Sequence, residues 1–245
     1  MDPTLVVLAY SSAAAAMGGL GAAPLLLRER LPVTAIGWSN ALAAGLMLGV
    51  AYALMILGLE RIPLSGALGA MLGIGFVYWT HAVSGTADLD LNRLDETQPE
   101  YGYQVLLVNT LHSAAEGVAI GVAMTVSLPF GAFTALAIAV HNVPEGTVLS
   151  AILTTRGVRL SHAAGLAVAA NVSQVLLAVV SFALVTAAPG LFPWVLGFAA
   201  GAMVYLVLVD LMPECYQQAG STSIGLVTIV AMGIVVLLVS GGVVR

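Results

Sequence analysis

Residues 103–154 read YQVLLVNTLHSAAEGVAIGVAMTVSLPFGAFTALAIAVHNVPEGTVLSAILT. This stretch contains two apolar runs, Tyr103–Ser127 and Phe130–Thr154, separated by little more than Leu128 and Pro129. A helix needs roughly 20 apolar residues to cross the hydrocarbon core of a bilayer. Each run is long enough, so the stretch predicts two neighbouring membrane-spanning helices joined by a tight turn.

Six further apolar runs of similar length flank this pair. Gly, Pro and charged residues punctuate them, as expected at the ends of membrane helices. The sequence therefore predicts an all-α integral membrane protein with eight transmembrane helices, forming one domain over residues 1–245. The six flanking spans are Leu5–Leu27, Ala35–Leu57, Pro63–Ser84, Leu160–Ala187, Phe192–Met212 and Ser223–Val244.

The composition excludes most soluble classes of protein. Of the 245 residues, 60% are hydrophobic and only 8% are charged, against about 25% charged in an average soluble protein. So few charged residues could not form the hydrophilic surface of a soluble enzyme, and they provide no basic surface for nucleic acid. The single cysteine, Cys215, excludes an internal disulfide and a cysteine-based zinc site.

Arginines indicate the orientation, because basic residues gather on cytoplasmic loops. With the N-terminus outside, five arginines fall on cytoplasmic loops and two fall outside, so both termini are predicted to be extracytoplasmic. Short loops and a first span without a basic leader favour a retained helix and a prokaryotic inner (plasma) membrane. The cytoplasmic set is Arg28, Arg30, Arg93, Arg156 and Arg159, and the outer set is Arg61 and Arg245.

One long hydrophilic segment, about residues 85–102, follows the third span and is predicted to be a cytoplasmic loop. It carries five acidic residues and one arginine. Two interpretations stay open: a solvated linker, or a loop that weakly attracts cations.

The quoted stretch contains the same pattern twice. His112 and Glu116 are four residues apart in the first run, and a glycine follows the glutamate. His141 and Glu145 repeat this spacing in the second run, again followed by glycine. Residues four apart share one helical face, and antiparallel neighbours bring both pairs near the middle of the bilayer. Ionisable side chains at that depth are costly and indicate function.

Two imidazoles and two carboxylates facing one point suit a borderline divalent cation. These donors favour Zn²⁺ and also accept Fe²⁺, Mn²⁺ or Cd²⁺, whereas Ca²⁺ requires more oxygens. The sequence therefore predicts a midplane metal site formed by His112, Glu116, His141 and Glu145.

Other functions of the same residues remain open at this point. A zinc-bound water could serve an intramembrane hydrolase, although both carboxylates are already used as ligands. A proton-coupled carrier of an organic solute would need a larger aromatic-lined cavity, and only 7% of the residues are aromatic. A metal-free proton relay and a purely structural role are the remaining alternatives.

On these residues the chain resembles the ZIP (Zrt/Irt-like) family of metal transporters, and most of all its prokaryotic branch. The likeness also includes the eight spans, the loop after the third span and the segment Asp210–Glu214. It implies a 3+2+3 arrangement, with the outer triplets forming an inverted pseudo-repeat around the two motif helices. It further implies movement of divalent metal, Zn²⁺ first, into the cytoplasm, with no enzyme activity and no cofactor. Alternating access, with the motif helices moving against the outer ones, and a homodimer are expectations of the family alone.

Several residues are carried over through this resemblance. Asn142 matches a polar position beside the second motif histidine. Gln174 stands where relatives have a glutamate that helps to bind a second, adjacent metal ion, and an amide brings no charge. The second metal site is therefore expected to be weak or lost. Two interpretations of Asp210 and Glu214 stay open: a solvated pair that anchors the helix end at the membrane interface, or an exit or auxiliary metal site. The resemblance supports the metal site, which His81 could join.

Overall fold

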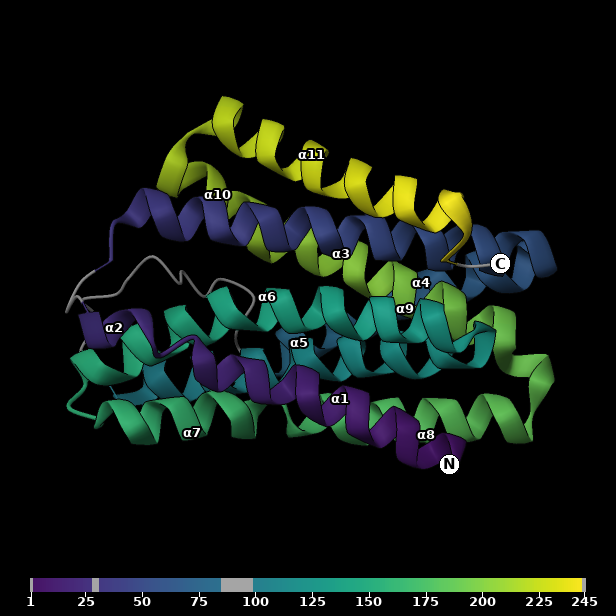
Figure 1. Ribbon diagram of the computed structural model, residues 1–245, viewed down its shortest axis with the longest axis horizontal. Helices are drawn as coiled ribbons and strands as arrows, with labels where there is room; N and C mark the ends of the chain where they lie inside the picture. Colours follow the sequence, from purple (N-terminus) through teal and green to yellow (C-terminus); the bar gives the residue numbers. More distant parts are fainter. Residues whose placement is uncertain (1, 28–30, 85–98, 244–245) are drawn as a thin grey trace.

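A computed structural model describes residues 2–27, 31–84 and 99–243. Every regular element in these ranges is helical (Figure 1). In chain order they are α1 (Pro3–Leu20), α2 (Pro24–Leu27), α3 (Val33–Arg61), α4 (Pro63–Ser84), α5 (Pro99–Val126), α6 (Leu128–Thr155), α7 (Leu160–Ala170), α8 (Val172–Ala187), η1 (Pro189–Leu191), α9 (Phe192–Leu206), η2 (Val207–Leu211), α10 (Met212–Ala219), α11 (Ser221–Leu238) and η3 (Val239–Val243).

These elements form 8 stretches long and apolar enough to cross a membrane, which confirms the predicted all-α fold with eight spans. The spans run from one end of the bundle to the other, and α1 begins at the same end where α11 finishes (Figure 1). Most of the predicted loop 85–102, together with Arg28, Arg30, Arg93 and Arg245, lies outside the described residues.

Two details differ from the predicted spans. The seventh span continues through α10 to Ala219, so Glu214 lies inside a helix and not in a loop. The sixth span is broken into α7 and α8 at Asn171. Backbone breaks at membrane depth persist where protein surrounds them, and Asn171 is buried.

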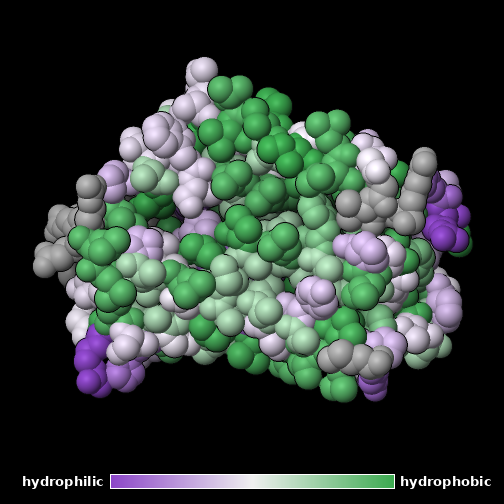
Figure 2. All heavy atoms as spheres, viewed as in Figure 1, coloured by the Kyte–Doolittle hydropathy of each residue, from purple (hydrophilic) through white to green (hydrophobic). Residues whose placement is uncertain are grey.

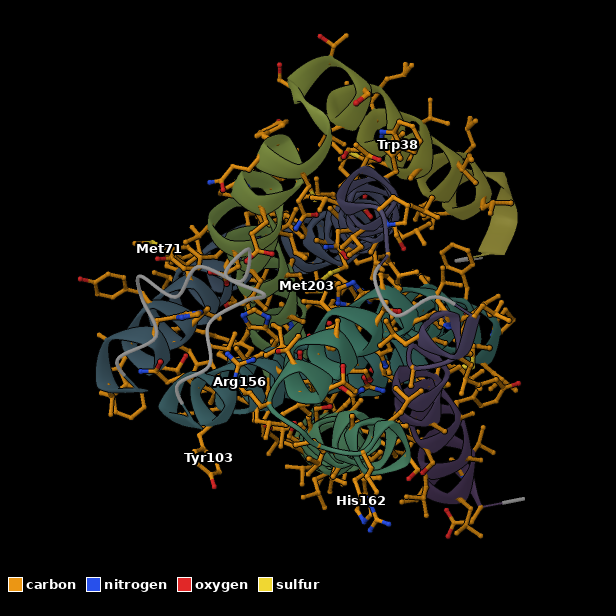
Figure 3. All side chains as sticks on the ribbon, turned by 90° about the vertical axis from the view of Figure 1, so that its left-hand side faces the viewer. Trp38, Met71, Tyr103, Arg156, His162 and Met203 are labelled. Atoms are coloured by element: carbon orange, nitrogen blue, oxygen red, sulfur yellow. The ribbon has the colours of Figure 1, made fainter. Side chains whose placement is uncertain are left out.

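The surface of the bundle fits a membrane environment. Apolar side chains cover its middle, and strongly hydrophilic side chains gather toward the two ends (Figure 2). Viewed along the bundle, Met203 lies at the centre, whereas Tyr103 and His162 lie at the periphery (Figure 3). His162 is exposed, as expected of a surface residue.

Close packing at glycines joins one group of helices: α3, α4, α9, α10 and α11. Of these, α3, α10 and α11 lie in the upper part of Figure 1. A Cβ atom at Gly69 or Gly73 of α4 would collide with the backbone of α9. A Cβ atom at Gly45 of α3 would collide with the backbone of α11. Small residues let helices approach closely in lipid, where van der Waals packing drives their association. These helices therefore pack as a unit, called here the α3 group.

The remaining long helices, α1, α5, α6, α7 and α8, form a second unit, called here the α6 group. Glycines again mark the contacts: Gly146 of α6 packs on the backbone of α1, and Gly117 of α5 packs on the backbone of α8. Buried polar bonds add to this packing. Ser113 Oγ on α5 lies 2.5 Å from Asn171 Oδ1, and Ser173 Oγ of α8 donates to the Thr110 carbonyl at 2.7 Å.

The helix pairs that pack together in one half of the chain correspond to pairs in the other half. α4 packs on α9 as α11 packs on α3, and α1 packs on α6 as α8 packs on α5. Exchanging spans one to three with spans six to eight, and span four with span five, converts each pair into the other. An inverted repeat produces this pattern, and the 3+2+3 relation itself stays a prediction.

Candidate metal site

Three of the four predicted midplane ligands converge between α5 and α6. His141 Nε2 lies 3.0 Å from Glu116 Oε1 and 3.7 Å from Glu145 Oε2. One ligand atom from each residue lies within 4.8 Å of the others. We call Glu116, His141 and Glu145 the first group.

The geometry of the first group suits a small dication. Ligands 2.0–2.2 Å from a tetrahedral Zn²⁺ lie about 3.3–3.6 Å from one another, and the two distances at His141 bracket that range. Glu116 is 0% exposed, and among the described residues neither of its carboxylate oxygens has a hydrogen-bond partner beyond the ion pair to His141. A buried carboxylate requires an opposite charge nearby to compensate for the loss of hydration. A dication would neutralise both carboxylates.

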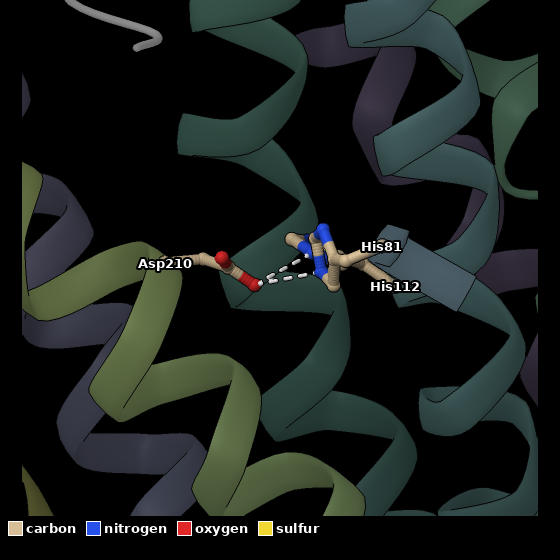
Figure 4. A group of neighbouring side chains, drawn as sticks. All are labelled: His81, His112 and Asp210. Atoms are coloured by element: carbon tan, nitrogen blue, oxygen red, sulfur yellow. Dashed lines mark ion pairs between the residues drawn. The ribbon is translucent and has the colours of Figure 1, made fainter. Parts of the chain in front are cut away.

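The fourth predicted ligand, His112, turns to a different partner. Its Nε2 lies 3.0 Å from Asp210 Oδ2, on the π-helical turn η2 of the seventh span. His81 Nε2, from the last turn of α4, lies 3.3 Å from the same oxygen. All three side chains point toward one another (Figure 4). We call His81, His112 and Asp210 the second group, and its ligand atoms also lie within 4.8 Å of one another.

His81 is predicted from the sequence only as a possible addition to the auxiliary site, and its partnership with His112 is not predicted. No His, Asp or Glu stands three or four residues from His81 in the sequence, so no local pattern indicates a site there. The contact depends on how α4 and α9 pack, and a single sequence does not show that. π-Helical turns such as η2 are frequent at functional sites.

The two groups border one cavity of about 40 Å³. His141 and Glu145 line it from the first group, and His112 and Asp210 line it from the second. Glu214, the other residue of the predicted auxiliary pair, lines the same cavity. Five of the six ionisable residues predicted as ligands therefore line one small cavity, and the sixth, Glu116, contacts His141.

Comparison with known proteins also indicates a zinc transporter. A family model described as ZIP zinc transporter matches residues 87–241. A candidate zinc transporter of Arabidopsis thaliana is 32% identical over 222 residues, covering 88% of this chain and 35% of that protein. Zinc transporter GufA of Myxococcus xanthus is 30% identical over 218 residues, covering 81% of this chain and 84% of GufA. Human zinc transporter ZIP13 is 31% identical over 128 residues, covering 48% of this chain and 34% of ZIP13.

The chain belongs to the ZIP zinc transporter family. This ZIP-family chain spans about a third of the length of its Arabidopsis and human relatives, and most of the length of GufA. The region matched by the ZIP model includes the whole first group, together with His112 and Asp210, and begins after His81. The resemblance predicted from the motif helices is thereby confirmed.

Two amides of this ZIP-family chain, Asn142 and Gln174, lie beside the first group. Asn142 Nδ2 donates to Gln174 Oε1 at 3.0 Å and to the Ala14 carbonyl at 2.8 Å. Gln174 Nε2 donates to the Ser11 carbonyl at 3.2 Å. The pair therefore ties α6 and α8 to α1, and the Gln174 oxygen already accepts a hydrogen bond.

Proposed function

We propose that this ZIP-family chain carries a divalent metal ion, Zn²⁺ first, across a membrane, with the first group as its principal binding site. The observation that carries the proposal is a buried cluster of two carboxylates and one imidazole between two adjacent membrane-crossing helices. Borderline donors of this kind suit Zn²⁺ and accept Fe²⁺, Mn²⁺ and Cd²⁺. Family membership supports transport over the hydrolase and solute-carrier alternatives.

His112 keeps a place in this proposal, but in the second group. Its ring borders the same cavity as His141 and Glu145, so an ion that leaves the first group meets His112 and Asp210 next. Asp210 therefore belongs to an auxiliary site downstream of the first group, and Glu214 lines the approach to it. This order fits the predicted exit role of Asp210 and Glu214.

The amides support a single strong site. Gln174 Oε1 accepts a hydrogen bond from Asn142, so one of its two lone pairs is already used. Neither amide carries charge, so two dications side by side would share only the two carboxylates of the first group. We therefore retain a weak or lost second adjacent site, with Asn142 and Gln174 as spacers between α1, α6 and α8.

The direction of transport and the membrane come from the sequence. The arginine distribution supports extracytoplasmic termini, and the short loops support an inner (plasma) membrane. Movement of metal into the cytoplasm is what the family resemblance implies. A homodimer remains an expectation of the family.

Packing supports a larger moving unit than the two motif helices. α5 and α6 are bound to α1 and α8 by glycine contacts and buried hydrogen bonds, so they cannot slide alone without breaking these contacts. The ion pair between His112 and Asp210 joins the α6 group to the α3 group. Alternating access by relative movement of the two groups follows, with this ion pair at their interface.

Metal uptake into proteoliposomes tests the proposal, with Zn²⁺, Cd²⁺, Mn²⁺ and Fe²⁺ assayed in parallel. We expect saturable uptake with Zn²⁺ among the best substrates. In the same assay, Asp210→Asn should lower zinc uptake roughly 10–100-fold, the usual cost of losing a group that supports metal binding, because both histidines lose their anionic partner. One equivalent of zinc should still bind, since the first group is intact.

The two parts of this experiment fail separately. If the wild-type protein takes up none of the four metals, transport itself is contradicted. If Asp210→Asn transports zinc at the wild-type rate, only the role of the second group is contradicted.

A further inference from the structure

One residue that lines the cavity between the two groups belongs to none of the sequence motifs. Alongside the ionisable residues, Asn40 of α3 lines this cavity. At about 40 Å³, the cavity has room for an ion that has lost most of its hydration, since a single water needs roughly 10–15 Å³. Whatever ion moves from Glu145 to Asp210 through this space therefore passes next to Asn40.

Burying the polar side chain of Asn40 at its position in α3 is energetically unfavourable. Asn40 is 4% exposed and lies within a membrane-crossing helix of high apolar content. A polar side chain buried there costs free energy unless it finds a polar partner. The polar groups that share its cavity are two imidazoles, three carboxylates and the Asn109 amide, from α5, α6, η2 and α10. Asn40 is also the residue that α3 contributes to the same cavity, and α3 packs on α6 at the boundary between the two helix groups.

We propose that Asn40 contacts the metal ion, its side-chain carbonyl oxygen taking a coordination position as the ion passes between the first and second groups. The inference rests on the proposed transport function and adds a binding residue to it. An amide oxygen is a neutral acceptor, so it replaces lost water without holding the dication as a carboxylate does. Conduction requires binding strong enough to admit the ion and weak enough to release it.

The chemistry predicts different uptake kinetics for two substitutions of Asn40. Asn40→Ala removes the oxygen and leaves the ion without a ligand between the groups, so the maximal rate of zinc uptake should fall roughly tenfold. Asn40→Asp keeps an oxygen in place and adds a negative charge, which binds the ion more tightly and slows its release. Its KM and its maximal rate should therefore both fall severalfold.

The experiment measures initial rates of zinc uptake into proteoliposomes over a range of zinc concentrations, for wild type, Asn40→Ala and Asn40→Asp. Ser39→Ala is the control, because Ser39 is the neighbouring residue and lines a different cavity, beside Val143 and Pro144. It should transport as the wild type does. Thermal unfolding in detergent is recorded for each protein.

The outcomes distinguish failure of the transport proposal from failure of the role proposed for Asn40. Wild-type protein without uptake overturns the transport proposal and this inference with it. Wild-type uptake with unchanged kinetics in both Asn40 variants overturns the inference alone. So does loss of thermal stability in Asn40→Ala together with an unchanged KM in Asn40→Asp, because Asn40 would then only hold helices together. A lowered KM in Asn40→Asp supports the inference.

Discussion

Glu116→Gln should reduce saturable zinc uptake by more than about 100-fold while the protein remains folded. Glu116 is fully buried and supplies one of the two negative charges of the first group. Glutamine has nearly the same shape but no charge, so the buried dication would keep half of its compensation. Removing one partner of a buried charged pair costs about 3–5 kcal/mol, and each 1.4 kcal/mol is about tenfold in an equilibrium constant.

The measurement is zinc uptake into proteoliposomes, with Glu60→Gln as the matched control. Glu60 is an exposed carboxylate in the last turn of α3, and its neutralisation should leave uptake unchanged. Glu116→Gln should also elute as a monodisperse peak, since its amide oxygen can accept a hydrogen bond from His141. Wild-type uptake by Glu116→Gln would remove Glu116 from the site.

Gly197→Ala should destabilise the bundle, although alanine is the better helix former by about 0.5–1 kcal/mol. A Cβ atom at Gly197 of α9 would meet the backbone of Gly66 and Ala70 on α4. Backbone cannot move aside as a flexible side chain can, so the contact between α4 and α9 must open. Overpacking of this kind costs typically about 1–3 kcal/mol, which corresponds to a fall in Tm of roughly 2–12 °C for a chain of this size.

Gly233→Ala provides the opposite expectation in the same fold. A Cβ atom at Gly233 of α11 would meet nothing within 4 Å, so only the helix propensity changes and Tm should stay level or rise slightly. Thermal unfolding of both variants in the same detergent makes the comparison. Equal Tm values for Gly197→Ala and Gly233→Ala would contradict the close approach of α4 and α9.

Most of the fold could be predicted from hydropathy, because each span must present apolar side chains over the full thickness of the bilayer. The errors occur where that constraint ends. α10 continues the seventh span with polar residues such as Glu214, and a hydropathy pattern does not distinguish a polar helix end from a loop. The break occurs at Asn171, close to the polar residues Ser173 and Gln174. The span as a whole stays apolar enough to cross a membrane, so hydropathy shows no gap there.

The site could be predicted in part. Spacing of four residues places Glu116 with His112, and Glu145 with His141, on one face of each helix. Which ring turns toward which neighbour depends on helix rotation and on the third and seventh spans, as the contacts of His112 and His81 with Asp210 demonstrate. No His, Asp or Glu stands three or four residues from Asn40 in the sequence. Only the packing of α3 brings it to the cavity.

The most direct test of the central claim is an anomalous difference map from crystals of the protein soaked with zinc, recorded at the zinc absorption edge. We expect a peak between α5 and α6, about 2.0–2.2 Å from ligand atoms of Glu116, His141 and Glu145. Zinc found only at the second group or at the surface, with no density in the first group at saturating zinc, would contradict it.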